Sequence, residues 1–347
     1  MESKNIKRQE MKCAISLGRI VDLNKDLEPT KKELLSSSIF KNLITLTQKR
    51  ESSGTLVREL CEAFNGTCFV FNSSTTMQFC SYEVAKVLGV ENTGTLIDSS
   101  DVVSISSYPT YLSPLMKKKH VMASDLKQLI INMEVKNKQD ELIFQKLYTL
   151  YIIDQFLLPS TNYKMIQSKF FHLADDLEKV NSVNWSQVVL NHLCKALTDS
   201  KLSLSESGIQ QRVFNGCSPI LDIVVFERCP SICPDAQTQY SLLLEKYCTK
   251  RVDLWHLKHL TPDMVLPCLT CQPPPLLLPT PVENVMSSLN SSEGGDGEDL
   301  SRSLVSTFDS MAINQQEELR RSNRPRKLSQ KAKEAVKQEG GSRGRGN

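Results

Sequence analysis

The residues best suited to specific chemistry are the cysteines and histidines, of which the sequence has eleven and five. A zinc site needs four ligands, such as thiolates and imidazoles, that converge tetrahedrally. The best match to such a set is Cys229, Cys233, Cys268 and Cys271, with Cys248, His256 and His259 between the two pairs. The first pair has a loose spacing and neighbouring prolines, and free cysteines also serve as small core side chains. We therefore expect loop or core thiols and no metal, with zinc binding as the alternative.

The sequence carries no signature of a known catalytic apparatus. It contains no Walker A loop, no G-x-G-x-x-G phosphate loop, no G-x-S-x-G nucleophile elbow and no H-E-x-x-H pair. A cysteine protease pairs a thiolate with a histidine, but eleven cysteines and five histidines provide such pairs by number alone. We predict that the chain is not an enzyme and that it has no cofactor.

Cysteine usage and hydropathy also bear on the compartment. An odd number of scattered cysteines is typical of reduced thiols. No apolar run follows the basic residues near Met1, so we expect no secretory signal peptide. The most apolar stretch, Leu147 to Leu158, is shorter than the roughly 20 residues that a membrane span needs, and it contains Asp154. These features predict a cytosolic or nuclear protein with no membrane contact.

Positive charge is concentrated near the C-terminal end. From Arg320 onward there are ten basic and two acidic residues, a net charge of +8, whereas the preceding residues carry a net charge of −5. Such clusters bind nuclear import receptors or phosphates, and the alternative is a merely solubilising tail. We predict nuclear localisation, with receptor or phosphate contacts from Arg320, Arg321, Arg324, Arg326, Lys327, Lys331 and Lys333.

Composition divides the chain into three parts. Residues 1–35 form a mixed-charge leader, residues 36–271 a patterned body, and residues 272–347 a tail that is Pro-rich, then acidic, then basic. The tail has too few apolar residues to fold alone. Periodicity in the body is mainly helical. The predicted fold class is a mainly α body with a small β hairpin, followed by a disordered C-terminal tail.

The first half of the body contains the β element. Apolar spacing predicts a helix over 55–64 that Asn65-Gly66 ends. Two β-rich runs, 67–71 and 76–80, flank a short polar turn and predict a hairpin. Ser81 is then expected to cap a helix over 82–88, which Gly89 ends.

The second half is predicted to be helical throughout. Helices are expected after a Ser124 cap, over 140–158, over 164–179, after an Asn184 or Ser182 cap, and after a Ser218 cap with Pro219 as the first helical residue. The helix after Asn184 carries Trp185 on its apolar stripe. We therefore expect the indole to be buried in the core.

Four short segments resemble, in order, those of one protein family. They are a strand leading into a helix that ends in Leu-Gly, an apolar helix end, an Asp pair ahead of Asn-Trp, and Asn-Gly-Cys before an apolar helix. In this sequence they are Phe79 to Val90 with Gly94, Phe156 to Ser160, Asp175-Asp176 with Asn184-Trp185, and Asn215 to Cys217. Over roughly 39–229 their order and spacing resemble the plant mobile domain family, also labelled aminotransferase-like, of transposon-associated plant proteins.

The resemblance implies a function as well as a fold. Stand-alone members of that family are nuclear and linked to transposon silencing, and others precede a ubiquitin-like-protein protease domain. The aminotransferase label carries no cofactor lysine onto any position here. We therefore predict a non-catalytic nuclear interaction module of transposon-related origin, with an import receptor and an unidentified protein as partners. The alternatives are the N-terminal part of a transposon-encoded ubiquitin-like-protein protease fusion that lacks its catalytic domain, and a weak nucleic-acid binder acting through the basic tail.

Overall fold

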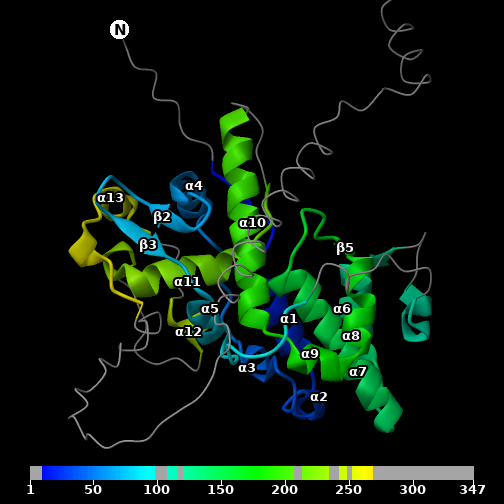
Figure 1. The fold of residues 1–347 in the computed structure, drawn as a ribbon. Helices are drawn as coiled ribbons and strands as arrows, with labels where there is room; N and C mark the ends of the chain where they lie inside the picture. Colours follow the sequence, from blue (N-terminus) through cyan, green and yellow to red (C-terminus); the bar gives the residue numbers. More distant parts are fainter. Residues whose placement is uncertain are drawn as a thin grey trace, which may run out of the picture. The chain divides into compact units, whose positions relative to one another are not determined.

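The computed structural model describes residues 10–97, 108–115, 120–206, 213–233, 242–247 and 252–268. Most of these residues are helical, and the strands form three two-stranded sheets (Figure 1). The predicted fold class, a helical body with a small β hairpin, is confirmed. The predicted tail, 272–347, lies outside the described residues.

The elements have the following bounds. The α-helices are α1 (Gly18–Asp26), α2 (Pro29–Leu34), α3 (Lys41–Ile44), α4 (Gly54–Ala63), α5 (Ser81–Leu88), α6 (Ala123–Asn132), α7 (Lys138–Ile152), α8 (Phe171–Asp175), α9 (Leu177–Ser182), α10 (Trp185–Glu206), α11 (Ser218–Arg228), α12 (Leu243–Lys246) and α13 (Leu254–Lys258). The 3₁₀ helices are η2 (Thr110–Leu115), η4 (Ser168–Phe170), η5 (Pro230–Ile232) and η6 (Pro262–Met264), and η3 (Ile153–Leu157) is a π-helix. The strands are β1 (Lys12–Cys13), β2 (Cys68–Val70), β3 (Thr76–Gln78), β4 (Val121–Met122), β5 (Met165–Ile166) and β6 (Val213–Phe214).

The strands pair in three ways. β2 and β3 form an antiparallel hairpin in which Phe69 lies opposite Met77, and both of these side chains are buried. β4 pairs with β5 antiparallel, and β1 pairs with β6 parallel. The last two sheets join segments that are distant in the sequence.

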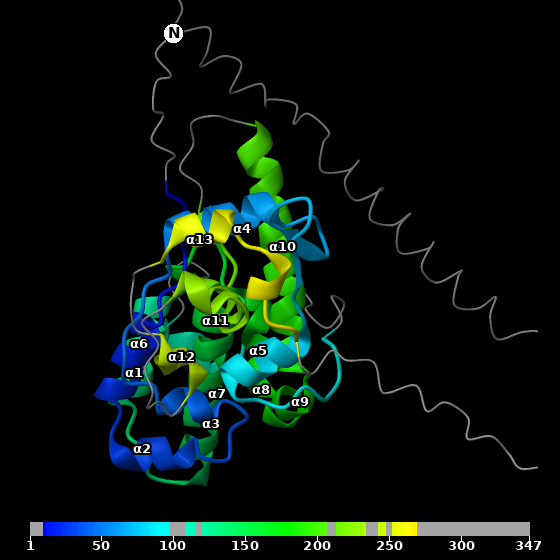
Figure 2. The ribbon, with the colours of Figure 1, turned by 90° about the vertical axis from the view of Figure 1, so that its left-hand side faces the viewer.

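The long helix α10 is the axis around which the other elements are arranged. Helices α4 and α5 pack on α10, and α11 packs on α4, α5 and α12. In Figure 1 the hairpin and α13 lie on one side of α10, and α6, α7 and α8 lie on the other. Figure 2 shows α11 between α4 on one side and α5 and α12 on the other. Because α11 is enclosed, all of its residues from Ser218 to Phe226 are buried. Apart from Ser218 and Asp222, this stretch is apolar on every face rather than on one stripe.

The first predicted helices and the hairpin are confirmed. Ser53 caps the start of helix α4, because its Oγ accepts a hydrogen bond from the backbone N–H of Leu56. The chain turns at Gly66 with a φ of 109° before entering β2. Helix α5 ends at Gly89 in the left-handed conformation, where a Cβ would lie 2.6 Å from the side-chain nitrogen of Asn42. Gly89 thus meets both a backbone and a packing requirement.

The predicted environment of Trp185 is also confirmed. Its side chain is fully buried, its Nε1 donates to the carbonyl of Val180 at 2.8 Å, and its ring meets Phe40 edge-on at 5.2 Å between centroids. The Oδ1 atom of Asn184 accepts from the backbone N–H of Gln187 at 3.0 Å. Asn184, not Ser182, is therefore the residue that caps α10.

The single helix predicted over 164–179 is wrong. Met165 and Ile166 form β5, and a 3₁₀ turn then leads into two short helices, α8 and α9. Asp176 separates these helices, because its Oδ1 accepts from the backbone N–H of Lys179 and caps α9. Sheet pairing and capping outweigh the apolar periodicity of this stretch.

The helix predicted over 140–158 is present with slightly shifted bounds, and it is less regular than expected. It begins at Lys138, because Asn137 Oδ1 accepts from two backbone N–H groups of the first turn. After Ile152 it widens into the π-helix η3. No helix among the described residues is long and apolar enough to span a bilayer.

Three predicted serine caps are wrong by one or two residues. The N-cap residues are Cys80, Met122 and Cys217, so that Ser81 and Ser218 are the first residues of α5 and α11, and Ser124 lies inside α6. In α6 the pairing of Val121 and Met122 in β4 sets the helix start. In α5 the start is set by Glu83, whose carboxylate accepts from the backbone N–H of Cys80.

Residues 12–34, assigned above to the leader, form β1, α1 and α2 in the structure. Leu17, Ile20 and Leu23 are fully buried in the same core as the body. Asn24 donates to the carbonyl of Leu43 and accepts from the hydroxyl of Tyr148. The helical body therefore begins near residue 12.

Candidate functional site

The sequence-predicted site residues lie mostly outside the described part of the chain. This holds for all seven basic residues between Arg320 and Lys333, and for Cys248 and Cys271 of the zinc hypothesis. Cys229 and Cys233 are buried in the core. Among the described residues, metal-ligand-type side chains come together at Cys80, Glu83 and Cys268. This group contains neither Cys229 nor Cys233.

The two histidines of the zinc hypothesis have other contacts. His256 Nδ1 lies 2.8 Å from the carboxylate of Asp253, and the His259 ring stacks on Trp255 with 4.3 Å between centroids. Hydrogen bonds from His256 and its backbone lower the pKa of Asp253. Both histidines thus belong to the local structure of α13.

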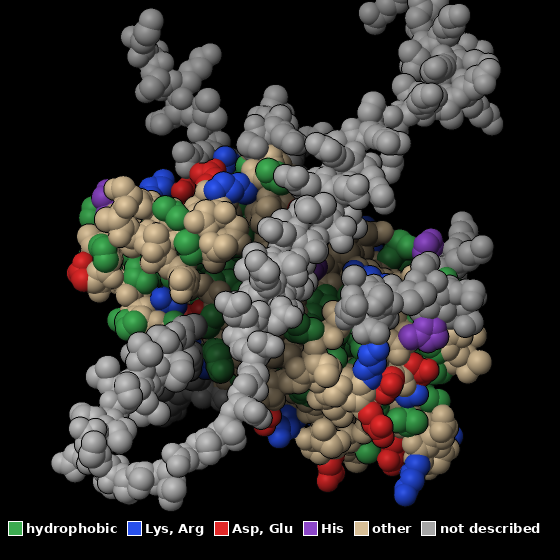
Figure 3. Space-filling view, in the orientation of Figure 1, with side chains coloured by type: hydrophobic (Ala, Val, Ile, Leu, Met, Phe, Trp, Pro, Cys, Tyr) green, Lys and Arg blue, Asp and Glu red, His purple; other side chains and the backbone are tan. Residues whose placement is uncertain are grey.

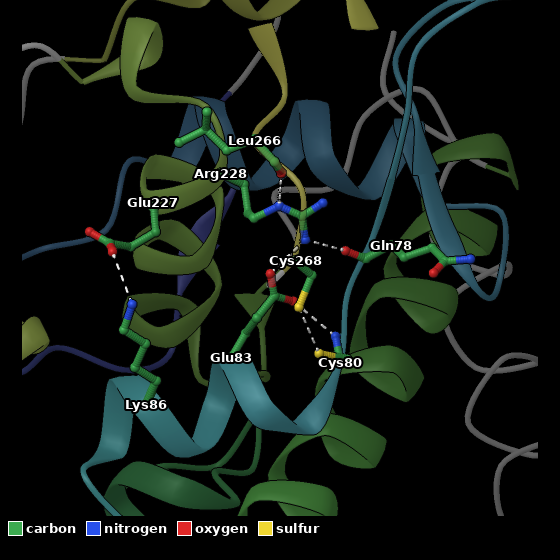
Figure 4. A network of polar contacts seen from close by, with 8 residues as sticks. All are labelled: Gln78, Cys80, Glu83, Lys86, Glu227, Arg228, Leu266 and Cys268. Carbon is green, nitrogen blue, oxygen red and sulfur yellow. Dashed lines mark hydrogen bonds and ion pairs between the residues drawn. The ribbon is translucent and has the colours of Figure 1, made fainter. Parts of the chain in front are cut away.

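The Cys80 group lies where three segments meet: the start of α5, the end of α11, and residues 266–268 after η6. Figure 4 shows Cys80 and Glu83 at the start of α5, Arg228 reaching toward them from α11, and Cys268 beside both. We call Cys80, Glu83, Arg228 and Cys268 the α5 junction. These residues are brought together by tertiary structure, since Glu83 and Arg228 are 145 positions apart and Cys80 and Cys268 are 188 apart.

Glu83 is held by two hydrogen bonds. Its Oε2 accepts from the backbone N–H of Cys80 at 3.0 Å, and its Oε1 accepts from Arg228 Nη1 at 2.6 Å. The first bond is half of a capping box, and the negative charge is favourable at a helix N-terminus. The second is a charge-assisted bond between side chains that are only 12% and 11% exposed. The carboxylate therefore has a fixed position.

Arg228 connects all three segments. Its guanidinium donates to the carbonyls of Gln78 and Leu266 in addition to Glu83. The backbone also takes part, since the N–H of Leu266 donates to the carbonyl of Arg228 at 2.8 Å. An arginine has five N–H donors in a rigid fork, which suits this role. Arg228 thus fixes residues 266–268 against α5 and the end of β3.

The two cysteines are in direct contact. Their Sγ atoms are 3.5 Å apart, far beyond the about 2.05 Å of a disulfide bond. Both side chains are half-buried. One thiol therefore meets another beside a carboxylate that is fixed by an arginine.

A pocket of about 480 Å³ opens beside the α5 junction. Its lining includes Tyr82, Val87, Val224, Leu243, Leu266 and Pro267. Tyr82 and Leu266 are about half exposed, at 50% and 47%. The hollow is therefore mainly apolar and is reached from the surface.

Charged side chains form the rim of this pocket. Lys86 is 71% exposed and lies 3.8 Å from Glu227, which also accepts from Lys246 and the Tyr247 hydroxyl at 2.6 Å each. Partial burial raises the pKa of Glu227, but these two hydrogen bonds outweigh it and hold the pKa below its ordinary value. Glu227 thus stays ionised, and the charge of Lys246 compensates it. The side chain of Lys86 is mostly exposed to solvent.

A second charged group includes Asp222 of α11 and lies in the core, outside the lining of the pocket. Asp222 and Arg50 form an ion pair at 3.4 Å, and their side chains are 0% and 3% exposed. Burial raises the pKa of Asp222 to about 6, and the nearby Arg50 opposes this shift. A perturbed carboxyl is often a sign of catalysis, but a substrate cannot reach one enclosed to this degree.

A family model for a domain of unknown function, DUF8566, matches residues 13–222, more than half of the chain. The chain belongs to the DUF8566 family. The DUF8566 match includes Cys80 and Glu83 and ends at Asp222, so Arg228 and Cys268 lie beyond it. No curated protein and no solved structure matches the chain.

Sequence reasoning missed most of the α5 junction. Only Cys80-x-x-Glu83 has a local signal, because its spacing is that of a capping box with cysteine in the serine position. Arg228 has no local signal, because its contacts with Glu83 and Gln78 join positions 145 and 150 residues apart. Cys268 was paired with Cys271 in the zinc hypothesis, whereas its described neighbour is Cys80.

Proposed function

We propose that this protein is a non-catalytic nuclear interaction module, and that it binds a protein partner at the pocket beside the α5 junction. The observation that carries this function is the pocket itself, an apolar hollow with a charged rim that ends at the exposed side chains of Tyr82 and Leu266. Buried apolar contacts surrounded by polar groups are the usual composition of a binding hot spot.

Other large apolar side chains are exposed outside the pocket. The large exposed side chains include Trp255 and Met264 on the segment that leads to Leu266, and Val70 at the end of β2. In Figure 3 green side chains gather over α13 and the β2–β3 hairpin, while charged side chains gather over α6, α7 and α8. An apolar region bordered by polar surface favours protein binding.

The chemistry of the pocket indicates the kind of partner. Glu83 and Arg228 compensate each other, and Glu227 is bound by Lys246. Lys86 keeps most of its surface exposed. We therefore expect a peptide segment that places an apolar side chain in the hollow and an acidic residue near Lys86.

The transposon-related origin remains a proposal that the sequence resemblance supports. Several resembling segments lie at element boundaries of the structure: Gly89 ends α5, Trp185 begins α10, and Cys217 caps α11. The resemblance implies a strand leading into a helix that ends in Leu-Gly, and β3 followed by α5 has this form.

Partner binding is tested by a peptide-display selection against the full chain, followed by titration of the selected peptides. Tyr82→Ala and Lys86→Glu should each weaken binding roughly tenfold or more, because hot-spot residues contribute about 2 kcal/mol or more. Matched controls are Leu202→Ala, also about half exposed, and Lys195→Glu, an exposed lysine on α10. Equal affinity for the variants and the wild type, or no selected peptide, would exclude this pocket as the binding site.

Nuclear localisation is tested separately, with a fluorescent fusion too large to enter the nucleus by diffusion. Alanines at Arg320, Arg321, Arg324, Arg326 and Lys327 should abolish nuclear accumulation, since these residues form the densest part of the basic cluster. The control has alanines at Arg343 and Arg345. Equal nuclear signal in all three fusions would remove the import function from this cluster.

The net charge of +8 from Arg320 onward favours weak nucleic-acid binding as a second candidate function. Binding through lysines and arginines releases counterions, so the affinity should fall steeply as salt is raised. Truncation before Arg320 should abolish it. Binding that is insensitive to salt or retained by the truncated chain would reject this function.

A further inference from the structure

The α5 junction has the composition of a metal site as well as that of a structural contact. Two thiols and a carboxylate lie at one point, with all three ligand atoms within 4.8 Å of one another. We propose that Cys80, Glu83 and Cys268 bind a zinc ion that fastens residues 266–268 to the start of α5.

The distance between the two sulfur atoms is close to that of a zinc site. A Zn–S bond of about 2.3 Å and a tetrahedral angle place two thiolate sulfurs about 3.8 Å apart. The Sγ atoms of Cys80 and Cys268 are already 3.5 Å apart. The half-buried position of both thiols shields bound metal while leaving a path for its entry.

Glu83 is prepared for a ligand role. Each carboxylate oxygen has about two acceptor positions, and the hydrogen bonds from Cys80 N–H and Arg228 use one on each oxygen. Ligating carboxylates in metal sites are usually held by such outer hydrogen bonds. Each oxygen therefore keeps one acceptor position that can coordinate the metal, while the two hydrogen bonds hold the carboxylate in place.

The charges balance when Arg228 is included. Two thiolates and one carboxylate carry three negative charges, zinc carries two positive charges, and Arg228 adds one more at 2.6 Å from Glu83. Thiolates favour soft metals such as zinc or Cu(I), and the hard carboxylate oxygen shifts this choice toward zinc. The group is thus electrically neutral with zinc bound.

The proposed site shares Cys268 with the zinc hypothesis formed from sequence, whose Cys271 lies outside the described residues. This site differs from the hypothesis formed from sequence, because Cys80 and Glu83 replace Cys229 and Cys233. Binding here would join α5 to a segment about 185 residues further along the chain, which restricts the unfolded chain as a crosslink does.

The test begins with the full chain purified under reducing conditions and dialysed against metal-free buffer. Zinc measured by mass spectrometry should match the protein concentration. It should fall at least about tenfold in the variant Cys80→Ser, Cys268→Ser, because the thiolate bonds supply most of the affinity of such sites. The matched control, Cys68→Ser, Cys194→Ser, also removes two half-buried thiols and should keep its zinc. Glu83→Gln keeps the capping box and should weaken zinc binding about tenfold.

A second measurement uses only the wild-type chain, so that it does not depend on how the variants fold. Removal of zinc with a chelator should raise the rate at which iodoacetamide modifies Cys80 and Cys268, with Cys194 unchanged as the reference. A chain without zinc, zinc that survives loss of both thiols, or protection of Cys229 and Cys233 instead would each overturn the site. None of these results depends on peptide binding at the neighbouring pocket.

Discussion

Helix α11 carries two arginine–carboxylate pairs in contrasting surroundings. Near its start, Asp222 meets Arg50 at 3.4 Å in the core, and the Nε and Nη1 atoms of Arg50 have no hydrogen-bond partner among the described residues. At its end, Arg228 meets Glu83 at 2.6 Å and also donates to two backbone carbonyls.

The Asp222–Arg50 pair is a structural contact within the core, whereas the Glu83–Arg228 pair belongs to a site near the surface. The inner pair desolvates two charges for one long contact, with the Arg50 guanidinium 5.0 Å from the centroid of the Phe226 ring as further compensation. The outer pair is better satisfied and borders a pocket and two thiols. The strongly raised pKa in these two pairs is that of Asp222 in the inner pair. A search for functional residues by pKa alone would therefore have selected the enclosed pair instead of the α5 junction.

The inner pair should produce the largest effect on stability when it is broken. Arg50→Met leaves the Asp222 carboxylate buried without its partner, and the free energy of unfolding should fall by about 3 to 5 kcal/mol. The variant Arg50→Met, Asp222→Leu removes both charges and should recover most of this loss. Urea unfolding of the three proteins gives the comparison. If the double variant is as unstable as Arg50→Met, packing rather than charge explains the loss.

The stability loss of Arg50→Met can be compared with that of a variant that breaks an uncharged core contact. Trp185→Ala removes a fully buried indole, its contact with Phe40 and its hydrogen bond to Val180. The free energy of unfolding should fall by about 3 to 5 kcal/mol. Trp255, the second tryptophan, is 63% exposed, so Trp255→Ala is the control and should cost far less. Native fluorescence that reports a solvated Trp185 would contradict the burial described above.

The outer pair should produce a smaller loss. Arg228→Met removes bonds to Glu83, Gln78 and Leu266 at a site where water can replace part of them. The free energy of unfolding should fall by about 1 to 3 kcal/mol. Limited proteolysis should show faster cleavage near Leu266, and the Lys195→Glu variant should cleave like the wild type. A loss as large as that of Arg50→Met would remove the contrast between the two pairs.

A further prediction concerns the pH dependence of stability. The pKa of Asp222 is about 6 in the folded chain and 3.8 ordinarily, so between these values the folded state holds a proton that the unfolded chain releases. The stability contribution of Asp222 is therefore fully present below about pH 4 and is lost as the pH rises through about 6. Relative to Asp222→Asn, the wild type should become less stable over this range. Parallel stability curves for the two proteins would contradict the shifted pKa.

Local patterns predicted much of the fold, and the reasons for success and failure are physical. Helix α4, the hairpin and the Gly89 end of α5 were predictable because periodicity, turn residues and a left-handed glycine act within a few positions. The stretch 164–179 was not, since Met165 and Ile166 pair with a strand more than 40 residues earlier. Long-range pairing leaves no periodic signal.

The candidate site was less predictable than the fold for the same reason. The thiol of Cys80 becomes a neighbour of Cys268 only after α5, α11 and η6 have packed. The hypothesis from sequence joined cysteines by spacing and selected Cys229 and Cys233, which the core encloses. Sequence spacing reveals only ligands that are close in the chain. The residues of the α5 junction come from three segments that are far apart in the sequence, so spacing could not reveal them.

The parallel pairing of β1 with β6 has a consequence for synthesis on the ribosome. Lys12 and Cys13 pair with Val213 and Phe214, so the N-terminal segment cannot form these bonds until about 200 further residues have emerged. At about 5 to 20 residues per second this delay is about 10 to 40 s. Throughout that time the apolar side chains of Ile15, Leu17 and Ile20 lack part of their final surroundings. The newly made chain is therefore expected to depend on chaperones until its C-terminal half arrives.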